Sequence, residues 1–275
     1  MALNLMYITN IPAVALIAEK YGVDRVMVDL ETLGKEERQK GMNTVQSHHT
    51  VDDVATISDM LTKAEMLVRV NPWNENSVCE VNSVIEAGAD RIMLPMWKSA
   101  DEVDKFLKTV NQRVHTTLLL ETKEAVGCLD VVLDNPLIDE IHIGLNDLHL
   151  SYGLSFIFEP LTNGLVEAIC EKCKAKNVPY GFGGIARIGE GMLPAEQIIM
   201  EHYRLGSTRV ILARSFCNTD EIHDISVIQS VFAENMERLR AYETLLENKT
   251  ANDYENNKQA VVECVKKIVC KIKEK

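Results

Sequence analysis

Residues 66–97 read MLVRVNPWNENSVCEVNSVIEAGADRIMLPMW. The segment starts and ends with nearly continuous apolar runs, Met66–Asn71 and Arg91–Trp97. Strands that are buried on both faces, as in a parallel sheet, have such runs. Between them, Asn76–Ala87 has a helical pattern that ends at Gly88, a residue type common just after helices. The segment therefore predicts one strand–helix–strand unit of a parallel sheet.

The same alternation continues along the chain. Eight strand candidates, each followed by a helical stretch, are Leu5–Thr9, Arg25–Glu31, Met66–Asn71, Arg91–Trp97, Thr116–Glu121, Glu140–Gly144, Pro179–Phe182 and Arg209–Arg214. Eight such units close into a (β/α)8 TIM barrel, an α/β fold. A doubly wound open sheet is the main competitor. We prefer the barrel because the count reaches eight and no dinucleotide glycine fingerprint follows the first strand.

About sixty residues follow the eighth strand candidate. Asp220–Glu247 has a long helical pattern, Thr250–Asn257 is polar and turn-like, and Gln259–Lys275 is a second amphipathic helix. We expect a barrel over residues 1–249 and a C-terminal helical extension over 250–275. The apolar stripe of the last helix must be buried on the barrel or on another subunit, and its members are Val261, Val262, Val265, Ile268 and Val269.

Composition excludes several classes of protein. The 275 residues are 46% hydrophobic and 25% charged, as in a soluble globular chain. A net charge of −12 argues against a nucleic-acid groove, which needs clustered lysine and arginine. No apolar run approaches the roughly 20 residues of a membrane span. Seven scattered cysteines and an N-terminus without a signal-peptide pattern favour the reducing cytoplasm.

Barrel active sites lie at the C-terminal ends of the strands. Glu121 and Asp147 follow the adjacent fifth and sixth strands. Two oxygen ligands with room for water suit Mg²⁺ or Mn²⁺, although both could be solvated loop carboxylates. Zinc is less favoured, because no cysteine or histidine cluster has its spacing. Cys170 and Cys173 lie within a helical stretch, which favours packing over metal binding.

Arg69 lies inside an otherwise apolar strand. A buried guanidinium must be paired, and its planar fork matches a substrate carboxylate. The alternative is an internal salt bridge with Asp29 or Glu31. Further candidates for substrate binding at the ends of strands six and seven are Gly144, Asn146 and Gly184.

Five motifs occur in a family-like order. They are Gly22-Val-Asp with Val-Asp29-Leu-Glu31, Val68-Arg69-Val-Asn71, Ala87-Gly-Ala-Asp-Arg-Ile-Met-Leu-Pro95-Met, Leu-Leu-Glu121-Thr122 with Glu124-Ala125, and Ile143-Gly144-Leu-Asn-Asp147-Leu148. With them the chain resembles the metal-dependent (class II) aldolase family that contains 4-hydroxy-2-oxoheptanedioate aldolase and the citrate lyase β subunit. The resemblance spans about residues 20–155 and, more loosely, extends to strand eight.

The resemblance implies a barrel of the phosphoenolpyruvate/pyruvate type. It implies that Glu121 and Asp147 hold the divalent metal and that Arg69 contacts the carboxylate or keto oxygen of pyruvate. The implied reaction is reversible cleavage of a 2-keto-4-hydroxy acid to pyruvate and an aldehyde. A metal acting as Lewis acid, with Arg69 beside it, would stabilise the pyruvate enolate.

The chain departs from the family pattern in two places. Members often carry a histidine directly after the strand-two glutamate, paired with an acid on a later helix. Here Thr32 follows Glu31, and we place the acid at Glu86. The second departure is the run Gly181–Arg187, whose glycines could bind phosphate or form a tight turn.

An inserted segment before the second helix contains His48 and His49. Either could fold over the mouth and replace the missing base, or both could be surface histidines. We favour His49, because it precedes Thr50, a plausible N-cap for the helix that starts near Asp52.

Two other functions stay open. One is an acyl-CoA lyase of the citrate or malyl-CoA type, although this acidic chain has no evident basic patch for CoA. The other is a catalytically silent barrel that binds a keto acid or a partner protein. The resemblance also implies a homo-oligomer with exchanged C-terminal helices, in which Asp220–Glu247 would be the exchanged element.

Overall fold

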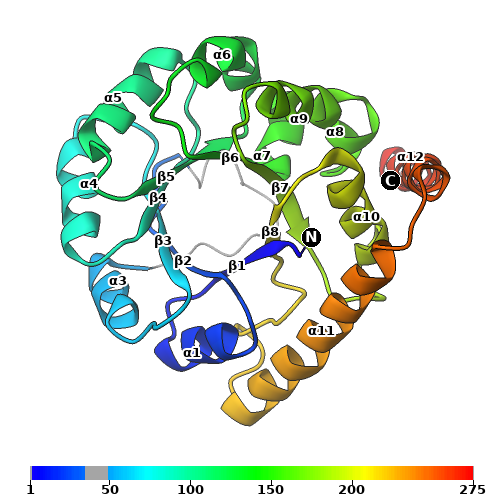
Figure 1. Cartoon of the computed structure of the whole chain (residues 1–275), viewed down its shortest axis with the longest axis horizontal. Coiled ribbons are helices and arrows are strands. Elements are labelled where there is room, and N and C mark those ends of the chain that lie inside the picture. The colour runs from blue at the N-terminus through cyan, green and yellow to red at the C-terminus, as the bar shows by residue number, and fades with distance from the viewer. Residues whose placement is uncertain (1, 35–48, 275) are drawn as a thin grey trace.

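The computed structural model describes residues 2–34 and 49–274. Its strands form a closed barrel in which neighbours in sequence are neighbours in space and β1 pairs with β8 (Figure 1). The strands, all parallel, are β1 Asn4–Ile8, β2 Arg25–Asp29, β3 Glu65–Arg69, β4 Arg91–Leu94, β5 His115–Leu120, β6 Glu140–Ile143, β7 Tyr180–Ile185 and β8 Arg209–Leu212. The predicted barrel is therefore confirmed, and the open sheet is excluded.

Helices surround the barrel (Figure 1). They are α1 Pro12–Lys20, α3 Val51–Ser58, α4 Ser77–Glu86, α5 Ala100–Val110, α6 Lys123–Leu133, α7 Leu145–Ser151, α8 Glu159–Thr162, α9 Leu165–Ala175, α10 Ala195–Leu205, α11 Ile225–Leu246 and α12 Ala251–Lys273. Thr50 caps α3 through a capping box with Asp53, as its place in the sequence predicted. None of the helices in the described ranges combines the length and apolar character that a membrane span requires.

The barrel interior has layers, because alternate residues of each strand point inward. Its middle layer is an apolar cluster of Met6, Met27, Leu67, Met93 and Leu119. Charged side chains lie in the layers on either side of it. This apolar floor lies between the polar groups at the two ends of the barrel.

A buried ion cluster closes the N-terminal end of the strands. The carboxylate of Glu140, 1% exposed, lies 2.6 Å from Arg25, 2.6 Å from Arg209 and 3.6 Å from Arg91. Burial alone would raise the pKa of Glu140, but the three arginines lower it to about 2. The second carboxylate of the cluster, Glu65, lies 2.9 Å from both Arg25 and Arg91.

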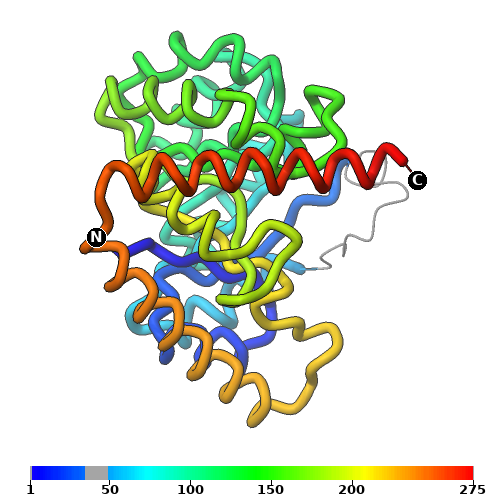
Figure 2. Tube along the Cα trace, turned by 90° about the vertical axis from the view of Figure 1, so that its right-hand side faces the viewer, coloured from blue at the N-terminus to red at the C-terminus, as the bar shows by residue number. Residues whose placement is uncertain are grey.

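The two C-terminal helices pack on their own barrel. In Figure 1, α11 crosses from α10 to α1, and Figure 2 shows α12 running along the outside of the molecule. Val261, Val265 and Ile268 of α12 are buried within the chain, in a helix that packs against α10 and α8. The apolar stripe of α12, which the sequence predicted to need a covering surface, is therefore covered by the same chain. It gives no reason by itself to expect that subunits exchange helices.

The start of α12 differs from the sequence-based prediction. The helix begins at Ala251 and includes most of the segment expected to be a turn. Thr250 forms a capping box with Asp253, which satisfies the first backbone N–H groups. Asn257 is buried, and its amide donates to the Gln197 carbonyl at 3.0 Å and to Glu201 at 2.9 Å. Thr250 and Asp253 cap the helix, and Asn257 binds it to α10. These roles need polar residues, and the same residue types are common in turns, so the sequence pattern predicted a turn.

We predict that Glu140→Gln lowers the free energy of unfolding by about 3–5 kcal/mol at neutral pH, because it leaves buried arginines without their counter-charge. Since the folded pKa of Glu140 is about 2, below the unfolded value of about 4.3, its contribution is fully present above the unfolded value. It is lost as the pH falls through the folded value. Urea unfolding from pH 7 to pH 2 should show the difference from wild type shrinking.

The control is Asp134→Asn, which removes an exposed ion pair with Lys176 and should change stability by less than about 1 kcal/mol. An equally small effect of Glu140→Gln would mean that the cluster does not depend on its carboxylate.

Candidate active site

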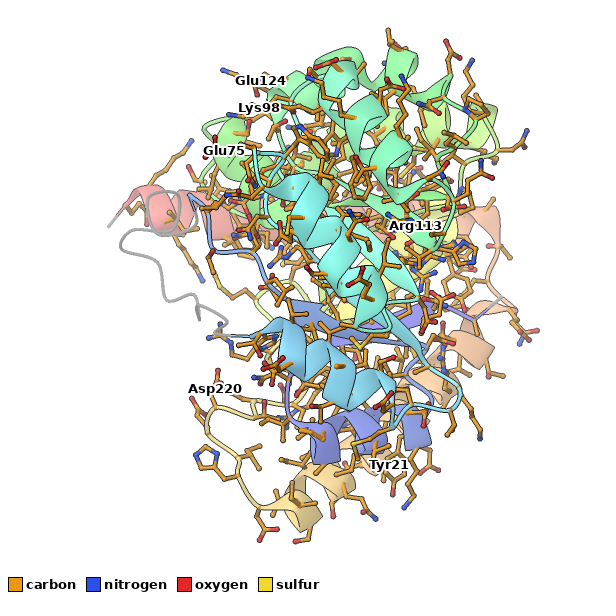
Figure 3. The ribbon with its side chains drawn as sticks, turned by 90° about the vertical axis from the view of Figure 1, so that its left-hand side faces the viewer. Tyr21, Glu75, Lys98, Arg113, Glu124 and Asp220 are labelled. Atoms are coloured by element: carbon orange, nitrogen blue, oxygen red, sulfur yellow. The ribbon has the colours of Figure 1, made fainter. Side chains whose placement is uncertain are left out.

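A cavity of about 410 Å³ opens at the C-terminal end of the strands. Figure 3 shows Glu75, Lys98, Glu124 and Asp220 at this end of the molecule, with Tyr21 and Arg113 toward the other. Seven of the residues named from the sequence line the cavity, namely His49, Arg69, Glu121, Gly144, Asn146, Asp147 and Gly184. A larger hollow of about 790 Å³ lies at the opposite end and contains none of these side chains, so the first cavity is the candidate active site.

Arg69 is held by two carboxylates from the end of β2. Its Nε and Nη2 each donate to Asp29 at 2.8 Å, and Nη1 lies 3.4 Å from Glu31. Burial would lower the pKa of Arg69, but Asp29, with Glu31 and Glu121, raises it. The internal salt bridge considered from the sequence is therefore present. A guanidinium has five donors, so a side chain that lines the cavity and uses two of them on Asp29 can still contact a ligand.

His49 is the histidine of the inserted segment that the described residues include, and His48 lies outside them. The backbone N–H of Asp29 donates to Nδ1 of His49 at 3.0 Å. This bond places the imidazole in the cavity wall, next to the N-terminus of α3.

Glu121 follows β5 and is 3% exposed. Its Oε1 accepts from the backbone N–H of Met96 at 2.9 Å. Met96 has φ of 53°, a left-handed conformation that non-glycine residues adopt rarely and often at functional sites. Burial raises the pKa of Glu121, and the nearby charges of Asp147 and Glu31 raise it further. These carboxylates are therefore arranged where a cation would relieve their repulsion.

The space beside Glu121 depends on Gly144. A Cβ at that position would lie 2.7 Å from Oε2 of Glu121, so glycine keeps this oxygen accessible. In the described ranges, no three His, Cys, Asp or Glu side chains form a metal-ligating group. Glu121 and Asp147, which both line the cavity, could offer two oxygen ligands, and Mg²⁺ or Mn²⁺ suits so small a set because these ions usually keep waters and bind substrate oxygens as well.

Glu86 does not reach this cavity. It is the exposed last residue of α4, and each barrel helix ends near the opposite end from the mouth. Glu80 lies six residues earlier, about 9 Å closer to the N-terminus of α4, and faces the C-terminal ends of the strands instead. It accepts from the Asn71 amide at 2.8 Å, and burial raises its pKa. The acid of α4 nearest the mouth is therefore Glu80.

Two features of the cavity wall escaped the sequence analysis. His142 is fully buried, its Nε2 lies 3.2 Å from the Gly183 carbonyl, and burial lowers its pKa to about 4. It shares the inward face of β6 with Gly144, so strand alternation could have indicated it. The glycine run contributes a bulge within β7, marked by a register shift between Gly181 and Gly184, and not a turn after the strand.

Residues 5–178 match the family model described as HpcH/HpaI aldolase/citrate lyase. A search among curated proteins gave no match.

Solved structures share the fold. An HpcH/HpaI aldolase from Desulfitobacterium hafniense DCB-2 superposes with a TM-score of 0.60 at 14% identity, covering 87% of this chain and 93% of that one. An HpcH/HpaI aldolase/citrate lyase family protein from Burkholderia cenocepacia J2315 gives 0.59 at 15% identity, covering 90% and 94%. Macrophomate synthase gives 0.54 at 14% identity, covering 77% of each chain. At these identities the likeness concerns the fold alone.

We predict that Gly144→Ala weakens Mn²⁺ binding at least tenfold while the barrel stays folded, because the new methyl group would press against Oε2 of Glu121. Titration followed by electron paramagnetic resonance measures the affinity. The matched control is Gly127→Ala on α6, where a Cβ meets nothing within 4 Å and alanine should favour the helix by about 1 kcal/mol. Unchanged Mn²⁺ affinity in the Gly144 variant would place the metal elsewhere.

Proposed function

We propose a reaction for this chain on one premise. The chain belongs to the HpcH/HpaI aldolase/citrate lyase family. Enzymes of this family are carbon–carbon lyases, and they generally depend on a divalent metal. We propose that this enzyme cleaves or forms a C–C bond of a 2-keto-4-hydroxy acid through a pyruvate enolate. The observation that carries the proposal is the meeting of Arg69, Glu121 and Asp147 in one cavity at the strand ends.

In this proposal Arg69 binds the pyruvyl end of the substrate. Its donors beyond those bonded to Asp29 face a carboxylate or keto oxygen in the cavity. During cleavage the C3–C4 bond breaks, and its electron pair forms the C2–C3 double bond of the enolate. Negative charge then grows on the keto oxygen, where a fixed guanidinium stabilises it most. The C4 hydroxyl loses its proton to water as the aldehyde forms, and C3 of the enolate then takes a proton from water to give pyruvate.

Glu121 and Asp147 would hold the divalent metal, Mg²⁺ or Mn²⁺. When bound, such an ion supplies Lewis-acid stabilisation of the enolate oxygen. The protein's own contribution is to hold the carboxylates. Met96 fixes one oxygen of Glu121, and Gly144 leaves room at the other. Asn146 and Gly184 line the same cavity and are proposed to contact the substrate.

The same residues would suit a lyase acting on an acyl-CoA thioester, and a catalytically silent barrel that only binds a keto acid would have the same pocket. Proton exchange at the pyruvate methyl separates these candidates, because it needs enolisation of pyruvate and no aldehyde.

A homo-oligomer stays a proposal, and light scattering at micromolar concentration measures the oligomeric state. Since the stripe of α12 is covered within one chain, assembly would have to use other surfaces.

We predict that Glu121→Gln and Asp147→Asn each abolish Mg²⁺- or Mn²⁺-dependent exchange at the pyruvate methyl. Chelator should do the same to the wild type. Folding should be kept, because removing one charge relieves the repulsion that raises the pKa of Glu121. Proton NMR in deuterated water follows the exchange, and thermal melting checks the fold. Full exchange in the presence of chelator would contradict the metal site.

We predict that Arg69→Lys lowers kcat/KM for a keto acid by about 30-fold or more. Lysine keeps the charge but loses the fork, and a disrupted buried charged contact costs about 2 kcal/mol or more. Arg238→Lys, on the exposed part of α11, is the control and should match the wild type. Wild-type kinetics in the Arg69 variant would show that the substrate carboxylate binds elsewhere.

A further inference from the structure

Strand β7 is irregular where it borders the candidate active site. Its pairing with β8 shifts register between Gly181 and Gly184, so the strand bulges there. Its pairing with β6 ends at Phe182, opposite Ile143. Gly183 follows that last pair and has φ of 53°, a left-handed conformation that glycine adopts without steric cost. The ladder with β6 therefore does not hold Gly183 in place.

The imidazole of His142 contacts this bulge from inside the barrel. Its Nε2 lies 3.2 Å from the carbonyl oxygen of Gly183. A carbonyl can only accept, so Nε2 carries a hydrogen and donates it. His142 is completely buried, and burial lowers its pKa to about 4, so the ring is neutral at neutral pH. A buried, uncharged side chain of β6 thus holds the bulge of β7.

The bulge also touches the first residue of α7. A Cβ on Gly183 would lie 2.7 Å from Cδ1 of Leu145, so the two residues are in close contact and any larger residue would displace the leucine. Leu145 is 1% exposed and begins α7. Asp147 belongs to the same first turn and lines the cavity. The bulge therefore contacts both a buried donor and the turn that carries a proposed metal ligand.

We infer that His142 is a positioning residue, which holds the β7 bulge against Leu145 and thereby keeps Asp147 where it can bind the divalent metal. The inference rests on the proposed function, in which Asp147 is one of the two metal carboxylates. Residues that orient metal ligands commonly change metal affinity by about 10- to 100-fold when they are substituted. Because protein interiors are close-packed, a shift of the bulge would pass to Leu145 and its helix turn.

Substitutions of His142 test this role through metal affinity. His142→Gln keeps an N–H donor at about the reach of Nε2, whereas His142→Leu removes the donor. Electron paramagnetic resonance titration of the full chain measures Mn²⁺ binding. We expect the affinity to fall about tenfold or more in the leucine variant and to stay within about threefold of wild type in the glutamine variant. Thermal melting checks that each variant is folded.

The bulge offers a second test that leaves the imidazole in place. Gly183→Ala would press a methyl group against Leu145, and we expect Mn²⁺ affinity to fall about tenfold or more. Gly164→Ala is the matched control, because Gly164 also has a positive φ, of 86°, but a Cβ there would meet nothing within 4 Å. This control should bind Mn²⁺ as the wild type does. Wild-type affinity in Gly183→Ala or in folded His142→Leu, or a glutamine variant as weak as the leucine one, would overturn the inference.

Proton exchange at the pyruvate methyl separates the positioning role from the proposed reaction. Saturating Mn²⁺ should restore most of the exchange in His142→Leu, because metal occupancy is what this variant loses. Exchange that stays low in the metal-loaded variant would show that His142 acts on the substrate itself, which overturns the positioning role. A wild type that binds Mn²⁺ without exchange or cleavage would refute the reaction and leave the positioning role to the affinities. A wild type that binds no Mn²⁺ would overturn both.

Discussion

The mouth of this barrel depends on a buried guanidinium held by a carboxylate of the neighbouring strand. Arg69 is inward on β3, where an unpaired charge would be costly, and Asp29 on β2 binds it through two nitrogens. The pairing requires β2 and β3 in the register that places these residues side by side. It also fixes the orientation of Asp29, whose backbone binds His49. Asp29 therefore contacts two residues of the cavity wall, Arg69 through its carboxylate and His49 through its backbone.

The two ends of the barrel have opposite charge balances, separated by an apolar floor. At the closed end, three arginines meet two carboxylates, and the pKa of Glu140 falls to about 2. At the open end, among the described residues, Arg69 lies near the carboxylates of Asp29, Glu31 and Glu121, and burial with the charges of Asp147 and Glu31 raises the pKa of Glu121. The first arrangement is satisfied within the chain. In the second, a cation bound beside Glu121 would relieve the repulsion from Asp147 and Glu31 that raises its pKa.

The sequence predicted the parts of this structure that follow from local pattern. Continuous apolar runs indicated eight buried strands, and polar residues at their ends indicated the mouth. The sequence-based prediction failed where a contact between residues far apart in the chain determines the local structure. The polar start of α12 makes sense only against Glu201 of α10. Glu80 differs from Glu86 through its contact with Asn71 at the end of β3, which the helical pattern alone does not reveal. The conformation of Met96 left no sign in the residue types.

The departure after Glu31 has a structural explanation. Thr32 occupies the position where related enzymes often carry histidine, and its N–H donates to Asn71 at 2.9 Å. Asn71 in turn donates to the Glu80 carboxylate, so a hydrogen-bond network joins the end of β2 to α4. An imidazole reaches the mouth from His49, at the other side of the inserted segment, and it is bound through Nδ1. The imidazole at this mouth is therefore held by the backbone of β2, whereas the family pattern pairs its histidine with an acid on a later helix.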